Sequence, residues 1–371
     1  MLGDEEAEAV HRVLETAWVT QGPRVEEFEA AVAAYCGAEH AVAVSSCTSG
    51  LHLSLLAAGV GPGDEVIVPS MSFIATANSV VHAGATPVFA EIDPATFNLD
   101  VDDVRARITE RARAIILVHQ LGLPADIDAF AALADEHGLR IVEDGACALG
   151  SRYQGAPIGS HGELVCLSFH PRKVITTGEG GMILVRSSDL AARLRRLRSQ
   201  GMDISDSDRH RADRLLQERY VEVGYNYRMT DLQAAIGIVQ MERLPGSIVT
   251  RQRLAKVYDD ALAESALIEV PVIPANVDWN VQSYAVRLRG FDAMRRDRVR
   301  EILMGEGIAT RPGVMTAHRE PAYRQRNPHE SLQVSEAASD GSLILPLHHG
   351  LDEADCREIA ALLERAVSEA A

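Results

Sequence analysis

Ser168-Phe-His-Pro-Arg-Lys-Val-Ile-Thr-Thr-Gly-Glu-Gly-Gly181 is the stretch that indicates most about the fold and chemistry of this chain. It follows a β-type run at residues 164–167, carries the single lysine Lys173, and leads into a second β-type run at 182–185. Most lysines are exposed and do no chemistry. A lysine on a turn between two buried strands is different, because a dry pocket would lower the pKa of its amine and make it a nucleophile that forms a Schiff base.

Outward from this stretch, short apolar runs alternate with helical patterns. Strands are predicted at 41–44, 65–68, 87–89, 114–118, 140–142, 164–168 and 182–185, and helices at 50–58, 73–83, 126–137 and 189–199. Such alternation predicts a mostly parallel sheet with helices on both faces and right-handed crossovers. In such sheets the active site gathers beyond the carboxyl ends of the strands.

The second half of the chain has a different pattern. Residues 202–220 are charged and weakly patterned, which predicts a loop. Helices at 230–244, 251–262, 292–306 and 352–367 and a strand at 284–288 predict a smaller α/β domain. Single cores stop growing at about 250–300 residues, so we predict a large domain over 1–244 and a small C-terminal domain over 245–371. The extreme N-terminus could pack with the small domain.

Composition excludes several classes of protein. The net charge of −17 argues against binding of nucleic acid, and it means that local groups must capture any phosphate. The acidic N-terminus lacks an apolar signal segment, and no apolar run approaches the roughly 18 residues of a membrane-spanning helix. We therefore expect a cytoplasmic protein with no membrane partner. Five scattered cysteines predict neither a disulfide framework nor a metal site.

Two further segments lie at the predicted carboxyl edge of the sheet. Residues 45–50 open a helix with small polar side chains and free N–H groups, which suits a phosphate, although an N-cap without a ligand would look the same. Asp144 ends another strand, and a carboxylate there needs a cationic partner unless it is an ordinary cap or ion pair. Together with Lys173 they form the set that holds pyridoxal 5′-phosphate (PLP): a phosphate cradle, a carboxylate for the pyridine nitrogen and an amine for the aldehyde.

With these residues placed, the sequence resembles the DegT/DnrJ/EryC1/StrS family, the sugar aminotransferases of PLP fold type I. The resemblance covers most of the chain. It rests on motifs that occur in the family's order, namely Gln21-Gly-Pro, Ser46-Cys-Thr-Ser-Gly50, Val68-Pro-Ser-Met-Ser-Phe73, Glu143-Asp-Gly-Ala146, Ser168-Phe-His-Pro-Arg-Lys173, Gly178-Glu-Gly-Gly181 and Gly224-Tyr-Asn-Tyr-Arg-Met-Thr-Asp231. It implies a large domain with a mostly parallel seven-stranded sheet and a smaller C-terminal α/β domain.

The resemblance assigns roles around the cofactor ring. Lys173 is expected to form the Schiff base and then to move the proton, and Asp144 to face the pyridinium nitrogen. Phe73 matches the aromatic that stacks on the ring, unless it is a plain core phenylalanine. Cys147 departs from the family, which often carries Gln or His beside the ring hydroxyl. We expect its thiol to be buried and neutral.

The resemblance also assigns the phosphate contacts and the assembly. Thr48, Ser49 and Ser168 are expected to hold the phosphate. Asn226 matches a residue that reaches the phosphate from the neighbouring subunit, which implies a homodimer with shared active sites. Four further candidates are substrate-binding residues: Glu179, Arg228, Arg311 and His318. The first two could equally form ion pairs in the fold, and the last two could equally be solvated loop residues.

Some relatives in this family are sugar dehydratases that carry histidine at the lysine position. Lys173 therefore favours transamination. The implied reaction is a ping-pong exchange, in which an amino acid, L-glutamate in our expectation, converts the Lys173 aldimine to pyridoxamine phosphate, and that form aminates a keto group on a nucleotide-linked deoxysugar. Two alternatives stay open: an aminotransferase acting on a keto-cyclitol in aminoglycoside biosynthesis, and a PLP-binding regulatory protein without turnover.

Overall fold

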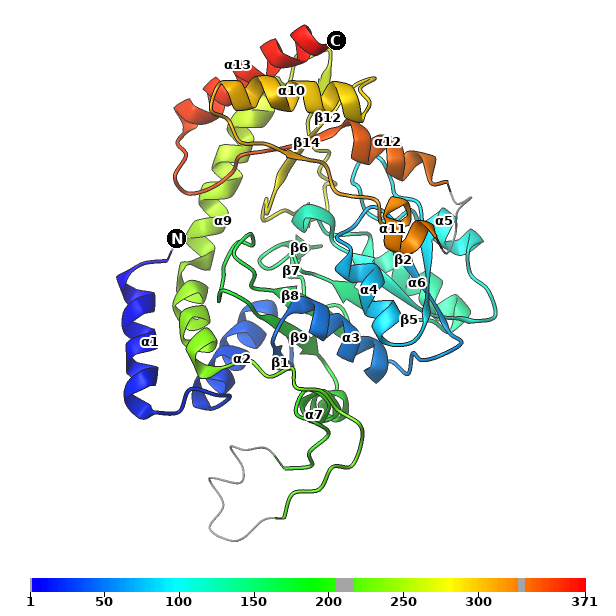
Figure 1. Ribbon diagram of the computed structural model, residues 1–371, viewed down its shortest axis with the longest axis vertical. Coiled ribbons are helices and arrows are strands. Elements are labelled where there is room, and N and C mark those ends of the chain that lie inside the picture. Colours follow the sequence, from blue (N-terminus) through cyan, green and yellow to red (C-terminus); the bar gives the residue numbers. More distant parts are fainter. Residues whose placement is uncertain (1, 205–216, 326–330) are drawn as a thin grey trace.

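A central sheet of seven strands organises the molecule (Figure 1). The computed structural model describes residues 2–204, 217–325 and 331–371. The strands follow the order β1 (His40–Val44), β9 (Gly181–Val185), β8 (Leu164–Ser168), β5 (Arg140–Asp144), β4 (Ala112–Val118), β2 (Glu65–Pro69) and β3 (Thr86–Ala90). Strand β9 is antiparallel to both neighbours, and the remaining pairs are parallel. The predicted mostly parallel seven-stranded sheet is confirmed.

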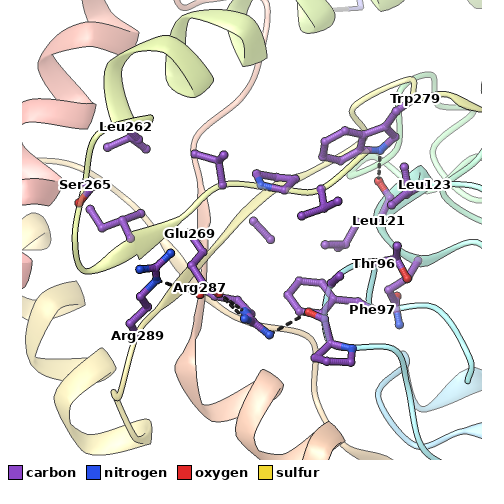
Figure 2. A pocket seen from close by; sticks show the side chains of 18 of the residues that line it. Thr96, Phe97, Leu121, Leu123, Leu262, Ser265, Glu269, Trp279, Arg287 and Arg289 are labelled. Carbon is purple, nitrogen blue, oxygen red and sulfur yellow. Dashed lines mark hydrogen bonds and ion pairs between the residues drawn. The ribbon is translucent and has the colours of Figure 1, made fainter. Parts of the chain in front are cut away.

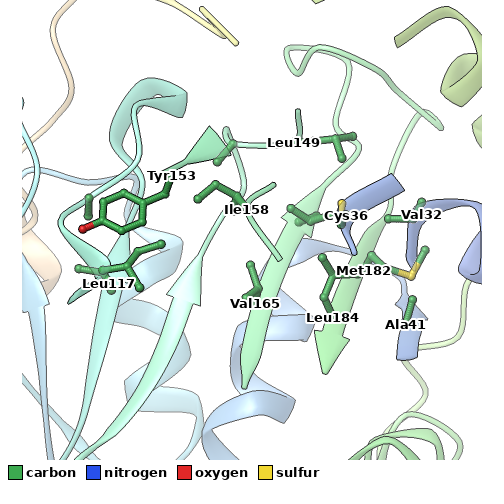
Figure 3. Packing of buried hydrophobic residues seen from close by; sticks show 14 of the residues in the cluster. Val32, Cys36, Ala41, Leu117, Leu149, Tyr153, Ile158, Val165, Met182 and Leu184 are labelled. Atoms are coloured by element: carbon green, nitrogen blue, oxygen red, sulfur yellow. The ribbon is translucent and has the colours of Figure 1, made fainter. Parts of the chain in front are cut away.

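Both faces of this sheet are buried, because alternate side chains of each strand point to opposite faces. On β4, Ile115 and Leu117 join one core, whereas Ala114 and Ile116 join the other. The first core is shown in Figure 3 and is covered by α2 (Pro23–Cys36) and α6 (Ile127–His137). The second is covered by α3 (Cys47–Ala57), α4 (Ala75–His82) and α7 (Ser188–Leu197). The short helix α5 (Val101–Ala106) contributes Val104 to the first core.

The C-terminal part builds a second, antiparallel sheet with its own core. Its strands follow the order β10 (Ile268–Glu269), β12 (Tyr284–Leu288), β14 (Ser342–Leu345) and β13 (Arg311–Pro312). Its helices are α10 (Ala293–Gly305), α12 (Gln333–Gly341) and α13 (Glu353–Ala370). The short helices η2 (Ala317–Arg319) and α11 (Pro321–Arg324) pack instead on the second core of the central sheet. A third sheet joins the two parts of the chain, in the order β11 (Val277–Asp278), β6 (Arg152–Tyr153) and β7 (Ala156–Pro157).

One long helix, α9 (Asp231–Leu262), runs from the first core of the central sheet to the core of the C-terminal sheet (Figure 1). The sequence predicted two helices, 230–244 and 251–262, and this is wrong, since the helix continues through Pro245. An interior proline costs about 3 kcal/mol, but Leu244, Ile248 and Leu254 are buried on either side of it. The division into domains at residues 244 and 245 stays a prediction, and α9 passes through that point.

The N-terminal helix α1 (Asp4–Thr16) lies along the first half of α9 (Figure 1). There Gln240 donates a hydrogen bond of 2.7 Å to Glu6. Of the predicted loop at 202–220, residues 205–216 lie outside the described residues, and Met202 forms an antiparallel bridge with Tyr220. No helix within the described ranges combines the length and apolar character needed to cross a bilayer.

Candidate active site

The carboxyl ends of the parallel strands open into one cavity of about 550 Å³. The segments that follow β1, β2, β4, β5 and β8 line it, and so do residues of β13 and β14 from the second sheet. Eight of the residues predicted from the sequence line this cavity: Thr48, Phe73, Asp144, Cys147, Ser168, Lys173, Glu179 and Arg311. The cavity is therefore the candidate active site.

Lys173 lies on the loop between β8 and β9, and its Nζ is 3.0 Å from Cys147 Sγ. Burial alone would lower the pKa of the Lys173 amine. The contact with Cys147 and the charge of Asp144 outweigh burial, so the pKa lies above its ordinary value. The expectation that the pKa of Lys173 is lowered is wrong for the protein without its cofactor, because Cys147 and Asp144 favour the ammonium form of the amine.

Asp144 ends β5 and is 7% exposed. Its Oδ2 accepts a hydrogen bond of 2.9 Å from Thr76 Oγ1, and its Oδ1 accepts one of 3.2 Å from the Ala146 N–H. Two donors thus hold the carboxylate in one orientation at the edge of the cavity. Cys47 lies beside it, and burial followed by the charge of Asp144 raises the pKa of that thiol far above its ordinary value.

The start of α3 forms the floor of the proposed phosphate cradle. Ser46 is the N-cap, and its Oγ accepts a hydrogen bond of 3.1 Å from the Ser49 N–H. The Ser49 hydroxyl in turn donates to Ser46 O at 2.8 Å, so it is engaged in the cap and does not line the cavity. Thr48 does line it. A Cβ on Gly181 would lie 2.5 Å from the Cys47 nitrogen, so only glycine lets β9 approach this helix end so closely.

Two side chains in the cavity have unexpected exposure. Phe73 lines the cavity and is 61% exposed, so it is not a core phenylalanine. Cys147 is half-buried, so the expectation of a buried thiol is wrong. Its sulfur faces the amine of Lys173 across the cavity, and the loop after β5 holds it there.

Besides Ser49, three predicted residues lie outside this cavity. Asn226 is exposed and forms an isolated bridge with Ser199. Arg228 lines a different cavity, beside Arg195 and Arg198. His318 is 4% exposed and is held between Ser70 and Glu336. The interpretation of His318 as a solvated loop residue is wrong, because its ring is buried and bonded through both nitrogens.

Several residues in the cavity or bonded to its lining were not identified from the sequence. Thr76 comes from α4 and belongs to no motif that names it. Gln282 lies just before β12, and its Nε2 donates a hydrogen bond of 2.8 Å to Arg172 O, which ties the lysine loop to the second half of the chain. Arg172 itself lines the cavity next to Lys173. Its place in the quoted stretch was the one signal available.

A second cavity of about 410 Å³ lies nearby, and Figure 2 shows its lining. Leu121 lines both cavities, and its carbonyl accepts a hydrogen bond of 3.0 Å from Trp279 Nε1. The charged groups in this second cavity are already paired, because Glu269 binds both Arg287 and Arg289 (Figure 2). None of the predicted site residues lines it.

The residues of the active-site cavity fit PLP. The cofactor needs an amine for its aldehyde, a buried carboxylate for its ring nitrogen and donors for its phosphate. Lys173 and Asp144 supply the first two, and both line the cavity. Thr48, Ser168 and the free N–H groups at the start of α3 supply the third. The exposed face of Phe73 provides a flat surface for a ring.

Comparison with known proteins agrees with this fit. The model of the DegT/DnrJ/EryC1/StrS aminotransferase family matches residues 1–364. GDP-perosamine synthase of Caulobacter vibrioides is 41% identical, over 98% of this chain and 96% of that protein.

Solved structures agree as well. The aminotransferase TlmJ of Streptoalloteichus hindustanus is 36% identical with a TM-score of 0.91, over 100% of this chain and 97% of that one. A Streptococcus pneumoniae relative solved in its PLP form is 28% identical with a TM-score of 0.92, over 100% and 98% of the two chains. The chain therefore belongs to the DegT/DnrJ/EryC1/StrS aminotransferase family and is a PLP-dependent aminotransferase of fold type I.

Proposed function

We propose that the enzyme transfers the amino group of L-glutamate to the keto group of a nucleotide-linked deoxysugar. The observation that carries this proposal is the cavity that brings Lys173 and Asp144 together, with space in front of the lysine. The relationship to GDP-perosamine synthase supports a nucleotide-linked acceptor. A lysine at position 173 supports transamination, since its amine can both hold and return a proton.

We assign the following work to the chain's own residues. Bound PLP supplies an electron sink for the carbon that carries the amino group. Asp144, held by Thr76, keeps a proton on the nitrogen that it faces. Thr48 and Ser168 bind the phosphate, and Phe73 covers one side of the ring. Lys173 Nζ moves the proton between the substrate carbon and the cofactor. Cys147 orients this amine through the 3.0 Å contact.

We also propose a homodimer in which Asn226 of one subunit completes the neighbouring site. Its exposure and its position outside its own cavity support this arrangement. The five free cysteines, four of them buried, support a reducing cytoplasm as the place of action. The second sheet with residues 245–371 is proposed as the small domain that covers the cavity.

The test uses the purified holoenzyme and follows the visible absorbance of the cofactor. Glutamate should bleach this absorbance, and a keto-sugar nucleotide added afterwards should restore it and appear as an aminated product in mass spectrometry. Lys173→Arg serves as the matched variant, which keeps the charge but should neither show the absorbance nor turn over. Colour that no amino donor bleaches would favour the regulatory alternative, and amination of keto-cyclitols alone would contradict the nucleotide-sugar proposal.

A further inference from the structure

Two arginines face the active-site cavity without an acidic partner. Arg172 precedes Lys173 on the loop after β8, and Arg311 lies on β13 of the second sheet. Within the described parts of the chain, neither guanidinium forms an ion pair or a side-chain hydrogen bond. Both residues are exposed where they line the cavity, so an anion that enters can reach the guanidiniums without displacing a protein carboxylate.

The backbone at both arginines is fixed. The Arg172 N–H donates a hydrogen bond of 3.2 Å to His170 Nδ1, and its carbonyl accepts the bond from Gln282. Arg311 pairs with Ile344 of β14. The two guanidiniums therefore approach the cavity from opposite parts of the fold. Burial, and then the charge of Arg172, lower the pKa of Arg311, as expected for like charges that share one unneutralised site.

Other arginines in similar positions do have partners. Arg319, close to Arg311 in sequence, is 2.9 Å from Asp340. Arg287 and Arg289 share Glu269 in the neighbouring cavity. The chain as a whole carries a net charge of −17, but these two cations line the same cavity. An anion that enters the cavity would be drawn to this pair.

Arg311 also lines an adjoining cavity of about 420 Å³. The two cavities share Gln282, Ser283, Arg311 and Ile344. The adjoining cavity has apolar walls that include Ile308, Leu347 and Leu351, and its volume lies in the range of small-molecule sites, about 300–1,000 Å³. Arg311 therefore lies between the active-site cavity, which contains Lys173, and the apolar adjoining cavity.

We infer that Arg172 and Arg311 bind the diphosphate of the acceptor, with its sugar toward Lys173 and its nucleoside in the adjoining cavity. The inference rests on the proposed nucleotide-linked acceptor. A diphosphate has two phosphoryl groups, one for each guanidinium. In a nucleotide sugar it joins a polar sugar, which suits the active-site cavity, to a nucleoside with a flat base, which suits the apolar adjoining cavity. The single carboxylate of an amino-acid donor would need only one bidentate arginine.

Binding is tested on the holoenzyme by calorimetry, with GDP, UDP and dTDP as probes and the matching nucleosides beside them. For the nucleotide that binds most tightly, Arg172→Gln and Arg311→Gln should each raise Kd about 10-fold or more, as loss of a charge-assisted bond does. Arg311→Lys should recover part of this loss. Nucleoside binding should change little in these variants, but Ala309→Trp, which fills the adjoining cavity, should weaken it.

Arg298→Gln is the matched control, because it removes the same charge from α10, where Arg298 pairs with Glu301 away from both cavities. Arg298→Gln should keep the wild-type rate of bleaching by glutamate. In Arg172→Gln and Arg311→Gln the cofactor absorbance shows that each variant is folded and loaded, and the bleaching rate should fall by a smaller factor than the one by which Kd for the nucleotide rises. The inference is overturned if these two variants bind nucleoside diphosphates as the wild type does, or if the glutamate step is the one that changes by the larger factor. If the wild-type enzyme aminates no nucleotide sugar at all, the proposed function fails instead.

Discussion

Lys173 and Cys147 are the pair of side chains that distinguishes this cavity at the scale of single residues. The thiol accepts a hydrogen bond from the amine at 3.0 Å and helps to raise the pKa of Lys173. A half-buried thiol in that place is thus a partner of the lysine. The family resemblance places this position, three residues after Asp144, beside the cofactor's ring hydroxyl, and the cysteine had put that contact in doubt.

We predict that Cys147→Gln keeps most of the activity, because the amide oxygen can accept the hydrogen bond that the sulfur accepts now. Cys147→Ala should behave differently, since it removes a group that raises the pKa of Lys173. In the apoenzyme the Lys173 amine should then lose its proton at a lower pH, and a pH series of PLP binding to the apoenzyme measures this change. Complete loss of activity in Cys147→Gln would contradict this account.

The residues expected to carry out the chemistry could be predicted from the sequence, but the residues that hold them in position could not. Lys173 and Asp144 were predicted because the amine, the carboxylate and the phosphate cradle fall at the same predicted edge of one sheet, although each alone has a common structural use. Thr76 was missed, since a threonine on a helix carries no sign that its hydroxyl meets a carboxylate 68 residues away along the chain. His318 was misjudged because burial comes from segments distant in sequence, and a histidine in a loop looks the same when it is solvated.

At the scale of elements, α3 separates two hydroxyls that are adjacent in sequence. We predict that Ser49→Ala lowers the free energy of unfolding by about 1 kcal/mol, because it removes half of a capping box. Thr48→Val should leave unfolding nearly unchanged but should weaken retention of PLP, since Thr48 lines the cavity. Denaturant unfolding and dialysis against cofactor-free buffer measure the two effects. Equal loss of cofactor in both variants would show that Ser49 also binds the phosphate.

The same helix carries a buried histidine. His52 is 3% exposed, its Nδ1 lies 3.3 Å from the hydroxyl of Tyr227, and its Nε2 has no partner within the described chain. Burial, and then the charge of His82, lower the pKa of His52 from 6.5 to about 4. The folded state therefore holds the neutral ring. Its stabilisation is complete above pH 6.5 and is lost as the pH falls toward 4.

We predict that, between pH 7 and pH 5, the wild type loses about 2 kcal/mol more stability than His52→Asn, because the unfolded chain takes up a proton that the folded ring refuses. Denaturant unfolding of each protein at the two pH values measures the difference, because the stability of each protein at pH 5 is compared with its own stability at pH 7. Parallel loss of stability in both proteins would show that His52 is protonated in the folded state as well.

The elements themselves were predicted where they are regular. Strands such as β4 and β8 could be located from apolar runs alone, because a parallel sheet buries both of their faces. The helix break predicted at Pro245 was wrong. Burial of Leu244, Ile248 and Leu254 outweighs the low helix propensity of proline, on which the prediction rested. The short strands β10 and β13 were not predicted, because two residues give no period to detect.

At the scale of the whole molecule, the proposed dimer makes a quantitative prediction. A mixture of Lys173→Ala and Asn226→Ala subunits should recover activity although each variant alone is nearly inactive. In a mixed dimer one site has both defects and the other has none. Random exchange of subunits should therefore restore about a quarter of the wild-type sites. Activity assays after refolding the two variants together, with each refolded alone as the control, measure this. No recovery would mean that Asn226 acts within its own subunit.

The seven strands of the central sheet all lie between residues 40 and 185. This has a consequence for the order in which a growing chain acquires its parts. Thr48, Asp144 and Lys173 are synthesised before any residue of the second sheet, and the strands β8 and β9 that bracket the lysine are neighbours in space as well as in sequence. The ribosome therefore delivers the half that holds the cofactor first. Arg311, which we assign to binding of the acceptor, is translated later, after the complete central sheet and Lys173 have been synthesised.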